Sequence, residues 1–260
     1  MRHAFRQHWR EYLLEGLGLG LFMVSAVGFA VLLFHPGSPL GAGDRLGRRL
    51  AMGIAMGLTA VALVYSPIGR RSGGHFNPAV TLAFLRLERI AGADAAWYVV
   101  FQALGGVMGV VAALLLFGPR VAHASVNYVV TVPGLSGPGV AFAAEAAISG
   151  ILMTVVLATS NHARLSRFTG LFAGALVATF ITFEAPLSGM SMNPARTLAS
   201  AVPSGVWTSA WIYLLAPILG MMAAVQLHAR RQRPVHCAKL YHPRGVRCIF
   251  RCDYAALEER

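Results

Sequence analysis

The stretch SGGHFNPAVT at residues 72–81 and its shorter counterpart MNPART at residues 192–197 decide the fold of this 260-residue chain. Both contain the tripeptide Asn-Pro-Ala, with Asn77 in the first copy and Asn193 in the second. Asparagine is a favoured N-cap and proline is favoured in the first helical turn, so each tripeptide predicts the start of a helix. The apolar pieces at 77–86 and 193–202 are about ten residues long, too short to cross a bilayer, and are interpreted as re-entrant half-helices.

Six longer apolar runs surround these two pieces, and each is long enough to cross ~30 Å of hydrocarbon. They cover residues 12–34, 49–67, 95–117, 139–160, 168–184 and 207–229. The composition agrees with a membrane protein, because 56% of the residues are hydrophobic and only 12% are charged. The predicted fold class is therefore an all-α membrane protein with six transmembrane helices and two re-entrant half-helices. No cleavable signal peptide is expected, since Glu15 interrupts the first run.

The two halves of the chain repeat each other well beyond the tripeptide. The matched pairs are Glu15 with Glu145, Asn77 with Asn193, and Tyr98 with Tyr213. This gives a first repeat at 12–117, an extracytoplasmic linker at 118–138 and a second repeat at 139–230. Three spans per half is an odd number, so the halves have opposite topologies. Inverted repeats of this kind place a solute pathway near the membrane midplane, where the helices are discontinuous.

The distribution of arginine predicts the orientation in the membrane. Six spans place the N-terminal segment 1–11 and the tail 231–260 on one side, together with most of the arginine-rich connections. The positive-inside rule assigns that side to the cytoplasm. The expected location is the plasma (inner) membrane. Arg45, Arg48 and Arg49 oppose this assignment. The net charge of +12 is thus explained by topology, and no nucleic-acid partner is expected.

The two half-helices are expected to enter from opposite faces, so that their N-termini meet in the middle of the membrane. That junction combines the positive ends of two helix dipoles with the amides of Asn77 and Asn193, which can donate to a passing solute. Such a site accepts neutral dipolar molecules and repels cations and protons.

These motifs resemble the two signature loops of the aquaporin (major intrinsic protein) family, and the similarity covers about residues 11–230. The resemblance implies a passive channel for water, with small uncharged solutes as a second candidate. It also implies a homotetramer in the lipid bilayer, no cofactor and no enzymatic activity. The alternative is a proton- or ion-coupled secondary transporter, which would need an ionisable group in the pathway. The candidates for that group are Glu15, Glu145 and Glu184.

Both intramembrane glutamates of the repeat are interpreted as structural residues. A carboxylate in this setting is costly unless it is paired. We expect Glu15 and Glu145 to accept backbone N–H groups from the adjacent loops. The extended loop residues are expected to line the pore with their carbonyl groups: Gly73, Gly74, His75 and Phe76 in the first loop, and Gly189, Met190, Ser191 and Met192 in the second. For the His75 ring, packing and pore lining remain equal alternatives.

The resemblance also implies a selectivity constriction. Arg196 occupies the position of the family's constriction arginine, and counting back from it places Ile181 and Met190 in the same ring. Met56 fills the fourth position, although a one-residue insertion near Pro67 leaves Gly57 as an alternative. Three apolar side chains opposite one arginine replace few of a solute's bonds to water, so strongly hydrated polyols should be disfavoured.

The tail at 231–260 contains enough potential ligands for a zinc or iron site. They are His236, Cys237, His242, Cys248 and Cys252. Their spacing matches no standard zinc finger, so metal binding is one of two interpretations of the tail. The alternative is a basic peripheral segment with reduced thiols near anionic lipid headgroups.

Overall fold

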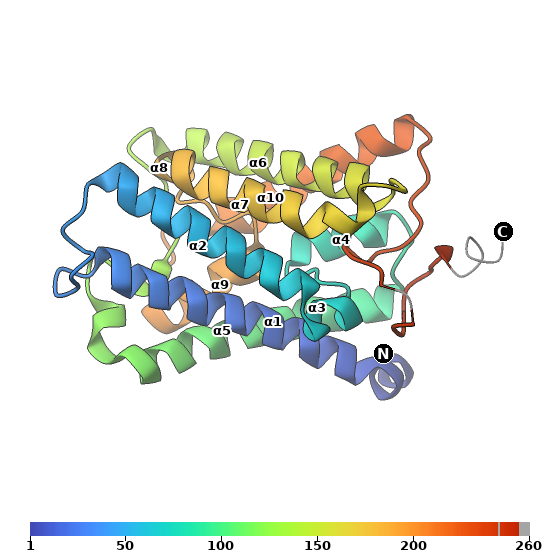
Figure 1. The fold of residues 1–260 in the computed structure, drawn as a ribbon, viewed down its shortest axis with the longest axis horizontal. Helices are drawn as coiled ribbons and strands as arrows, with labels where there is room; N and C mark the ends of the chain where they lie inside the picture. Colours follow the sequence, from blue (N-terminus) through green and yellow to red (C-terminus); the bar gives the residue numbers. More distant parts are fainter. Residues whose placement is uncertain (244, 255–260) are drawn as a thin grey trace.

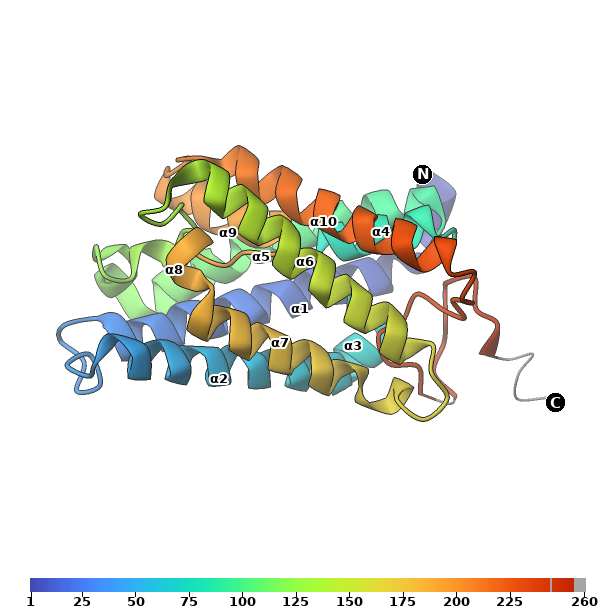
Figure 2. The same cartoon turned by 90° about the horizontal axis from the view of Figure 1, so that it is seen from above.

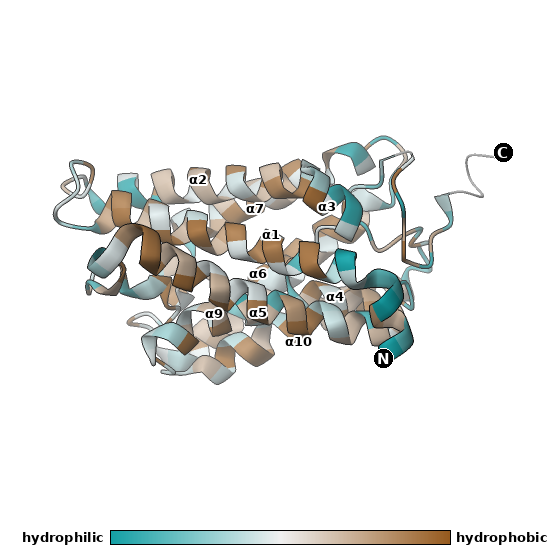
Figure 3. Cartoon of the chain, turned by 90° about the horizontal axis from the view of Figure 1, so that it is seen from below, coloured by the Kyte–Doolittle hydropathy of each residue, from teal (hydrophilic) through white to brown (hydrophobic). Residues whose placement is uncertain are grey.

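The computed structural model describes residues 1–243 and 245–254, which form an elongated bundle of helices (Figure 1). Six helices of this described part are long and apolar enough to cross a membrane. They are α1 (Arg2–Phe34), α2 (Arg45–Tyr65), α5 (Gly92–Phe117), α6 (Gly137–Ser160), α7 (Thr169–Phe183) and α10 (Ala210–Arg230). Hydrophobic residues cover the sides of the bundle and hydrophilic residues gather near its ends (Figure 3). The predicted all-α membrane fold is confirmed.

Two half-helices, α4 (Pro78–Arg86) and α9 (Pro194–Ser204), begin at the prolines of the two tripeptides. Helix α4 lies toward the end of the bundle that carries the N-terminus and residues 231–254, which we call the terminal face (Figures 1 and 2). Helix α9 lies toward the opposite end, which we call the far face. The predicted pair of re-entrant half-helices is confirmed.

Some boundaries differ from those expected. Helix α1 begins at Arg2 rather than at residue 12, so the N-terminal segment extends the first span. The short helices α3 (Pro67–Ser72) and α8 (Ala185–Ser188) precede the two loops and were not predicted. Each carries a proline in its first turn and is followed by a glycine with positive φ, Gly73 and Gly189. The remaining elements are the 3₁₀ turns η1 (Gly118–Ala122), η2 (Asn127–Val129) and η3 (Ser166–Phe168).

The packing of the spans follows the inverted repeat. Helix α1 packs on α5 and α6 packs on α10, while α2 and α7 join the two halves. Close approach depends on glycine at the crossings. A Cβ atom on Gly105 of α5 would collide with the carbonyl of Gly16, and one on Gly57 of α2 would lie 2.6 Å from the carbonyl of Gly174. Small residues at such crossings let helix backbones approach closely.

Candidate functional site

A cavity of about 370 Å³ lies between the spans and is lined by both re-entrant loops. Its wall includes Phe34 and Arg49, which stand at the far ends of α1 and α2. At the other end it includes Leu240 of the tail, which lies on the terminal face. The cavity therefore extends through the bundle from one face toward the other, and the two loops meet within it.

The two asparagines bridge the loops at the centre of this cavity. The Oδ1 atom of each accepts a backbone N–H from the first turn of the helix that it starts, at 2.9 Å for Asn77 and 3.0 Å for Asn193. The Nδ2 atom of Asn77 donates to the carbonyl of Met192, and that of Asn193 donates to the carbonyl of Phe76, both at 2.7 Å. Each amide has two hydrogens, so one remains for a molecule in the cavity.

Glu15 is completely buried in α1 and fastens the first loop. Its carboxylate accepts hydrogen bonds from the Ser72 hydroxyl at 2.7 Å, from the Gln102 amide at 2.8 Å, and from two backbone N–H groups of the loop. Those two come from His75 at 3.1 Å and Phe76 at 2.6 Å. The loop is thereby tied to the spans α1 and α5.

Glu145 of α6 is also completely buried and does the same for the second loop. It accepts from the Ser188 hydroxyl at 2.8 Å and from the backbone N–H groups of Ser191 at 2.6 Å and Met192 at 2.7 Å. These three donors correspond to Ser72, His75 and Phe76 around Glu15, whereas the Gln102 donor has no counterpart, so the inverted symmetry includes most of the side chains that hold the loops. This geometry fits the loop-supporting interpretation. It engages Glu15 and Glu145, two of the three carboxylates named for the transporter alternative, whereas the oxygens of Glu184 have no hydrogen-bond partner among the described residues.

Two tyrosines complete the support of the loops, a role that the sequence did not reveal. The hydroxyl of Tyr98 donates to the carbonyl of Ser72, and that of Tyr213 donates to the carbonyl of Ser188. Both tyrosines are completely buried. Their similar spacing from the two asparagines, 21 and 20 residues, was visible as a repeat. No pattern pointed to the serines, which end the unpredicted helices α3 and α8.

The loop backbone is strained at matched positions just before each asparagine. Phe76 has φ 46° and Met192 has φ 53°, both in the left-handed region that residues other than glycine seldom occupy. These are the residues whose carbonyls accept the bonds from the opposite asparagine. The left-handed turns thus occur where the carbonyls are aimed across the junction, as expected for strain held at a functional site.

The other loop residues have different roles. Gly74, His75, Gly189, Met190 and Ser191 line the cavity together with Phe76 and Met192. Gly73 differs from the expectation of a pore-lining carbonyl, because its carbonyl accepts the N–H of Leu240 at 3.0 Å. The ring of His75 lies at the cavity wall and is also packed, since its Nε2 atom lies 2.7 Å from the Ala238 carbonyl and its ring stacks on Phe84.

All four residues of the predicted constriction line this cavity: Met56, Ile181, Met190 and Arg196. Met56 is therefore favoured over the alternative Gly57, which faces α7. Among the residues that the structure describes, the buried Nη1 atom of Arg196 has no hydrogen-bond partner. An arginine donor left free beside a cavity is available to a solute.

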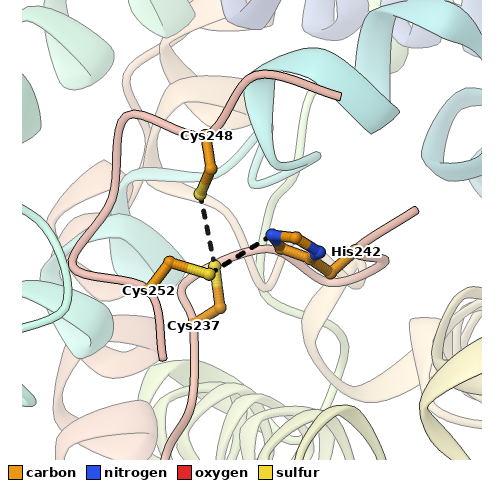
Figure 4. A group of neighbouring side chains, drawn as sticks. All are labelled: Cys237, His242, Cys248 and Cys252. Carbon is orange, nitrogen blue, oxygen red and sulfur yellow. Dashed lines mark hydrogen bonds between the residues drawn. The ribbon is translucent and has the colours of Figure 1, made fainter. Parts of the chain in front are cut away.

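Four of the five potential metal ligands in the tail lie together: Cys237, His242, Cys248 and Cys252 (Figure 4). The fifth, His236, is not part of this group. Its backbone N–H donates to the Asn161 side chain at 2.7 Å, and its ring lies edge-on to Tyr254. His236 is thus anchored to the end of α6 instead.

This chain is similar in sequence to several known proteins. The glycerol uptake facilitator protein-like 6 of Lactiplantibacillus plantarum is 35% identical over 230 residues, which cover 83% of this chain and 94% of that protein. Nodulin-26 of Glycine max is 38% identical over 178 residues, which cover 67% of this chain and 63% of nodulin-26. The probable aquaporin AqpM of Archaeoglobus fulgidus is 35% identical, and the match covers 73% of this chain and 79% of that protein.

A solved structure and a family model extend the comparison. The aquaglyceroporin of Plasmodium falciparum has a TM-score of 0.68 over 85% of this chain and 95% of its own, at 22% identity, which shows a shared fold. The model of the major intrinsic protein family matches residues 3–228. The chain therefore belongs to the major intrinsic protein family and is a multi-pass membrane protein of the passive channel class for water and small solutes.

Proposed function

We propose that the cavity between the two loops conducts water and small uncharged solutes, with Asn77 and Asn193 as the hydrogen-bond donors at its middle. The observation that carries this proposal is a reciprocal pair of hydrogen bonds. The side-chain amide of each asparagine donates to the backbone carbonyl of the residue that precedes the other asparagine. These bonds hold both amides at the junction of two helix N-termini. Partial positive charge at that junction favours the oxygen of a neutral solute and opposes a cation.

The proposal predicts water flow without proton flow. In proteoliposomes shrunk by an impermeant osmolyte, stopped-flow light scattering should give faster water exit than in empty liposomes. A pH-sensitive dye trapped in the same vesicles should show no channel-dependent leak under a proton gradient. A clear proton leak would contradict the barrier at the asparagines, and water flux that depended on the gradient would favour a coupled transporter.

We assign the selectivity constriction to Met56, Ile181, Met190 and Arg196. Their shared place on the cavity wall and the free Nη1 donor of Arg196 support this assignment. Arg196 supplies the charge and the hydrogen bonds, and the three apolar side chains supply a flexible wall. The constriction would admit water and small, weakly hydrated molecules. Polyols would lose more hydrogen bonds to water than the side chains of the constriction replace.

Introducing histidine at Ile181 should lower the ratio of urea to water permeability by about tenfold, the effect of roughly 1.4 kcal/mol. Histidine adds a hydrogen-bond donor and bulk to the same ring, which favours water over a larger solute. Ile181→Leu keeps volume and polarity and is the matched control, with no change expected. A ratio that rises or stays constant in folded Ile181→His protein would show that residue 181 is outside the constriction.

We place the terminal face in the cytoplasm and the protein in the plasma (inner) membrane. The arginines in the first turns of α1, around α4, between α6 and α7, and after α10 support this orientation. We also propose a homotetramer with one pathway per protomer. Exposed apolar side chains on α1 and α5, such as Leu17, Leu104 and Met108, provide surface for lipid or for a second copy.

The tetramer predicts that the protein mass measured in mild detergent, after subtraction of bound detergent, equals four chains. Light scattering coupled to size-exclusion chromatography measures this mass directly. Reconstitution of the same fraction shows whether it conducts water. A monomer that is stable and fully active in this experiment would contradict the tetramer.

A further inference from the structure

The tail brings together four side chains that are typical metal ligands. Cys237, His242, Cys248 and Cys252 each offer one ligand atom, and these atoms all lie within 4.8 Å of one another. The sulfur atoms of Cys237 and Cys248 are 3.5 Å apart, and the Cys252 sulfur lies 3.3 Å from Nε2 of His242 (Figure 4). All three cysteines are free thiols in this arrangement.

These separations suit a tetrahedral metal centre. With metal–sulfur bonds of about 2.3 Å and a metal–nitrogen bond of about 2.0 Å, the edges of a zinc tetrahedron are about 3.8 Å between sulfurs and about 3.5 Å between sulfur and nitrogen. Two of the six separations, 3.5 Å and 3.3 Å, are close to these edges, and none exceeds 4.8 Å. Three cysteines with one histidine are a common structural zinc set. Thiolate and imidazole ligands select zinc over calcium or magnesium, which prefer oxygen.

A counter-charge lies beside the cluster. Zinc bound by three thiolates and one neutral histidine carries a single negative charge. Lys239, the only lysine of the chain, is 2% exposed and donates from Nζ to the carbonyl of Arg247, the residue before Cys248, at 2.8 Å. A buried ammonium is costly without an anion close by, and a zinc thiolate centre would provide one.

The ligands lie on both sides of the tail residues that contact the first loop. Between Cys237 and His242, the Ala238 carbonyl accepts from Nε2 of His75, and the Leu240 N–H donates to the Gly73 carbonyl. The Leu240 side chain forms part of the cavity wall at the terminal face.

The second pair of ligands brackets another contact with the same loop. Between Cys248 and Cys252, the ring of Phe250 stacks on the ring of His75, with centroids 5.5 Å apart. A metal ion bound by all four ligands would therefore join the two tail segments that cover the first loop.

We propose that Cys237, His242, Cys248 and Cys252 bind one zinc ion, and that this ion holds the tail over the terminal mouth of the pathway with Leu240 in the cavity wall. Loss of zinc releases the tail and raises water permeability. The regulatory part rests on the proposed conduction path, whereas the metal site does not.

The metal site is tested on the full-length protein in detergent, purified through a tag without histidine and kept reduced. Elemental analysis should find one zinc per chain, and Cys248→Ser and Cys252→Ser should lose it. His236→Ala, which changes a tail histidine outside the cluster, should keep it. Replacement by cobalt should give the absorption of thiolate-bound tetrahedral cobalt. Absence of zinc and cobalt binding, iron in place of zinc, or a Cys237–Cys248 disulfide found by mass spectrometry would overturn the site.

The regulatory role is tested by water permeability in proteoliposomes with and without a membrane-permeant zinc chelator. Chelation should raise permeability per chain by about threefold or more, because zinc in excess of its Kd strongly favours the docked tail. Leu240→Ala should keep its zinc and show higher permeability before chelation. Unchanged permeability on loss of zinc would overturn the regulation. The zinc content is measured independently of transport, so the metal site and the conduction path are tested separately. If Leu240→Ala protein kept its zinc but showed no water flux, that result would count against the conduction path.

Discussion

Replacement of Glu15 by alanine is expected to abolish water conduction and to destabilise the protein strongly. The change removes the acceptor of four hydrogen bonds and leaves the donors of Ser72, His75, Phe76 and Gln102 buried without it. At about 1 kcal/mol or more for each unsatisfied donor, the free energy of unfolding should fall by about 4 kcal/mol. Thermal aggregation in detergent and stopped-flow permeability measure the two effects.

Two controls separate the carboxylate's role from a general loss of charge. Glu15→Gln keeps one oxygen acceptor but turns an amide NH₂ toward donors, so its stability should lie between those of the wild type and Glu15→Ala. Glu88→Gln changes an exposed acid and should leave stability and permeability unchanged. If Glu15→Ala retained wild-type water flux, the first loop would be held by other contacts and the supporting role of Glu15 would be wrong.

The sequence was most informative where one local motif dictates one local structure. Asn77-Pro78 and Asn193-Pro194 each combine an N-cap with a helix-starting proline, and both half-helices begin at those prolines. The matched glutamates were also identifiable, because a carboxylate within an apolar run requires partners. Signals of this kind depend on few residues and on no distant contact.

The helices α3 and α8 escaped prediction because they are too short to show a hydrophobic period. Each has only a proline in its first turn and a glycine after its last residue as a local signal. Their terminal serines, Ser72 and Ser188, gain meaning only when the fold places a glutamate and a tyrosine beside them.

The position of the tail could not be predicted, because it depends on contacts over long distances in the sequence. Leu240 meets Gly73 through backbone atoms of both residues, and Ala238 meets the His75 ring through its backbone carbonyl, so the tail residues that make these contacts leave no pattern in residue type. The same docking takes the Gly73 carbonyl out of the expected pore lining. It also separates His236 from the other potential ligands, a division that spacing alone did not indicate.

Replacement of Arg196 by valine is the second change with a large expected effect, because it removes a positive charge and several donors from the cavity wall. A fixed charge about 4 Å from a permeating cation contributes about 4 kcal/mol of repulsion at an effective dielectric constant near 20. Valine also leaves more room in the ring. Cation permeability should therefore rise by about tenfold or more, which corresponds to a conservative fraction of that electrostatic barrier. The ratio of glycerol to water permeability should also rise by about tenfold or more, because the ring is wider.

Two further variants divide this effect between charge and shape. Arg196→Lys keeps the charge and loses the planar fork of donors, so it should pass glycerol faster while still excluding cations. Arg49→Val removes a positive charge from the same cavity wall, near the far end of α2 and away from the loops. It should change neither the cation permeability nor the ratio of glycerol to water permeability much.

Comparison of the three variants by cation and glycerol permeability tests where the barrier lies. A barrier that depends on the guanidinium at the constriction gives cation leakage only in Arg196→Val, and faster glycerol passage in both Arg196 variants. A barrier spread over the positive charge of the whole cavity would instead make Arg49→Val leak as much as Arg196→Val. Unchanged selectivity in folded Arg196→Val protein would remove Arg196 from the constriction and leave the helix N-termini at Asn77 and Asn193 as the main barrier to cations.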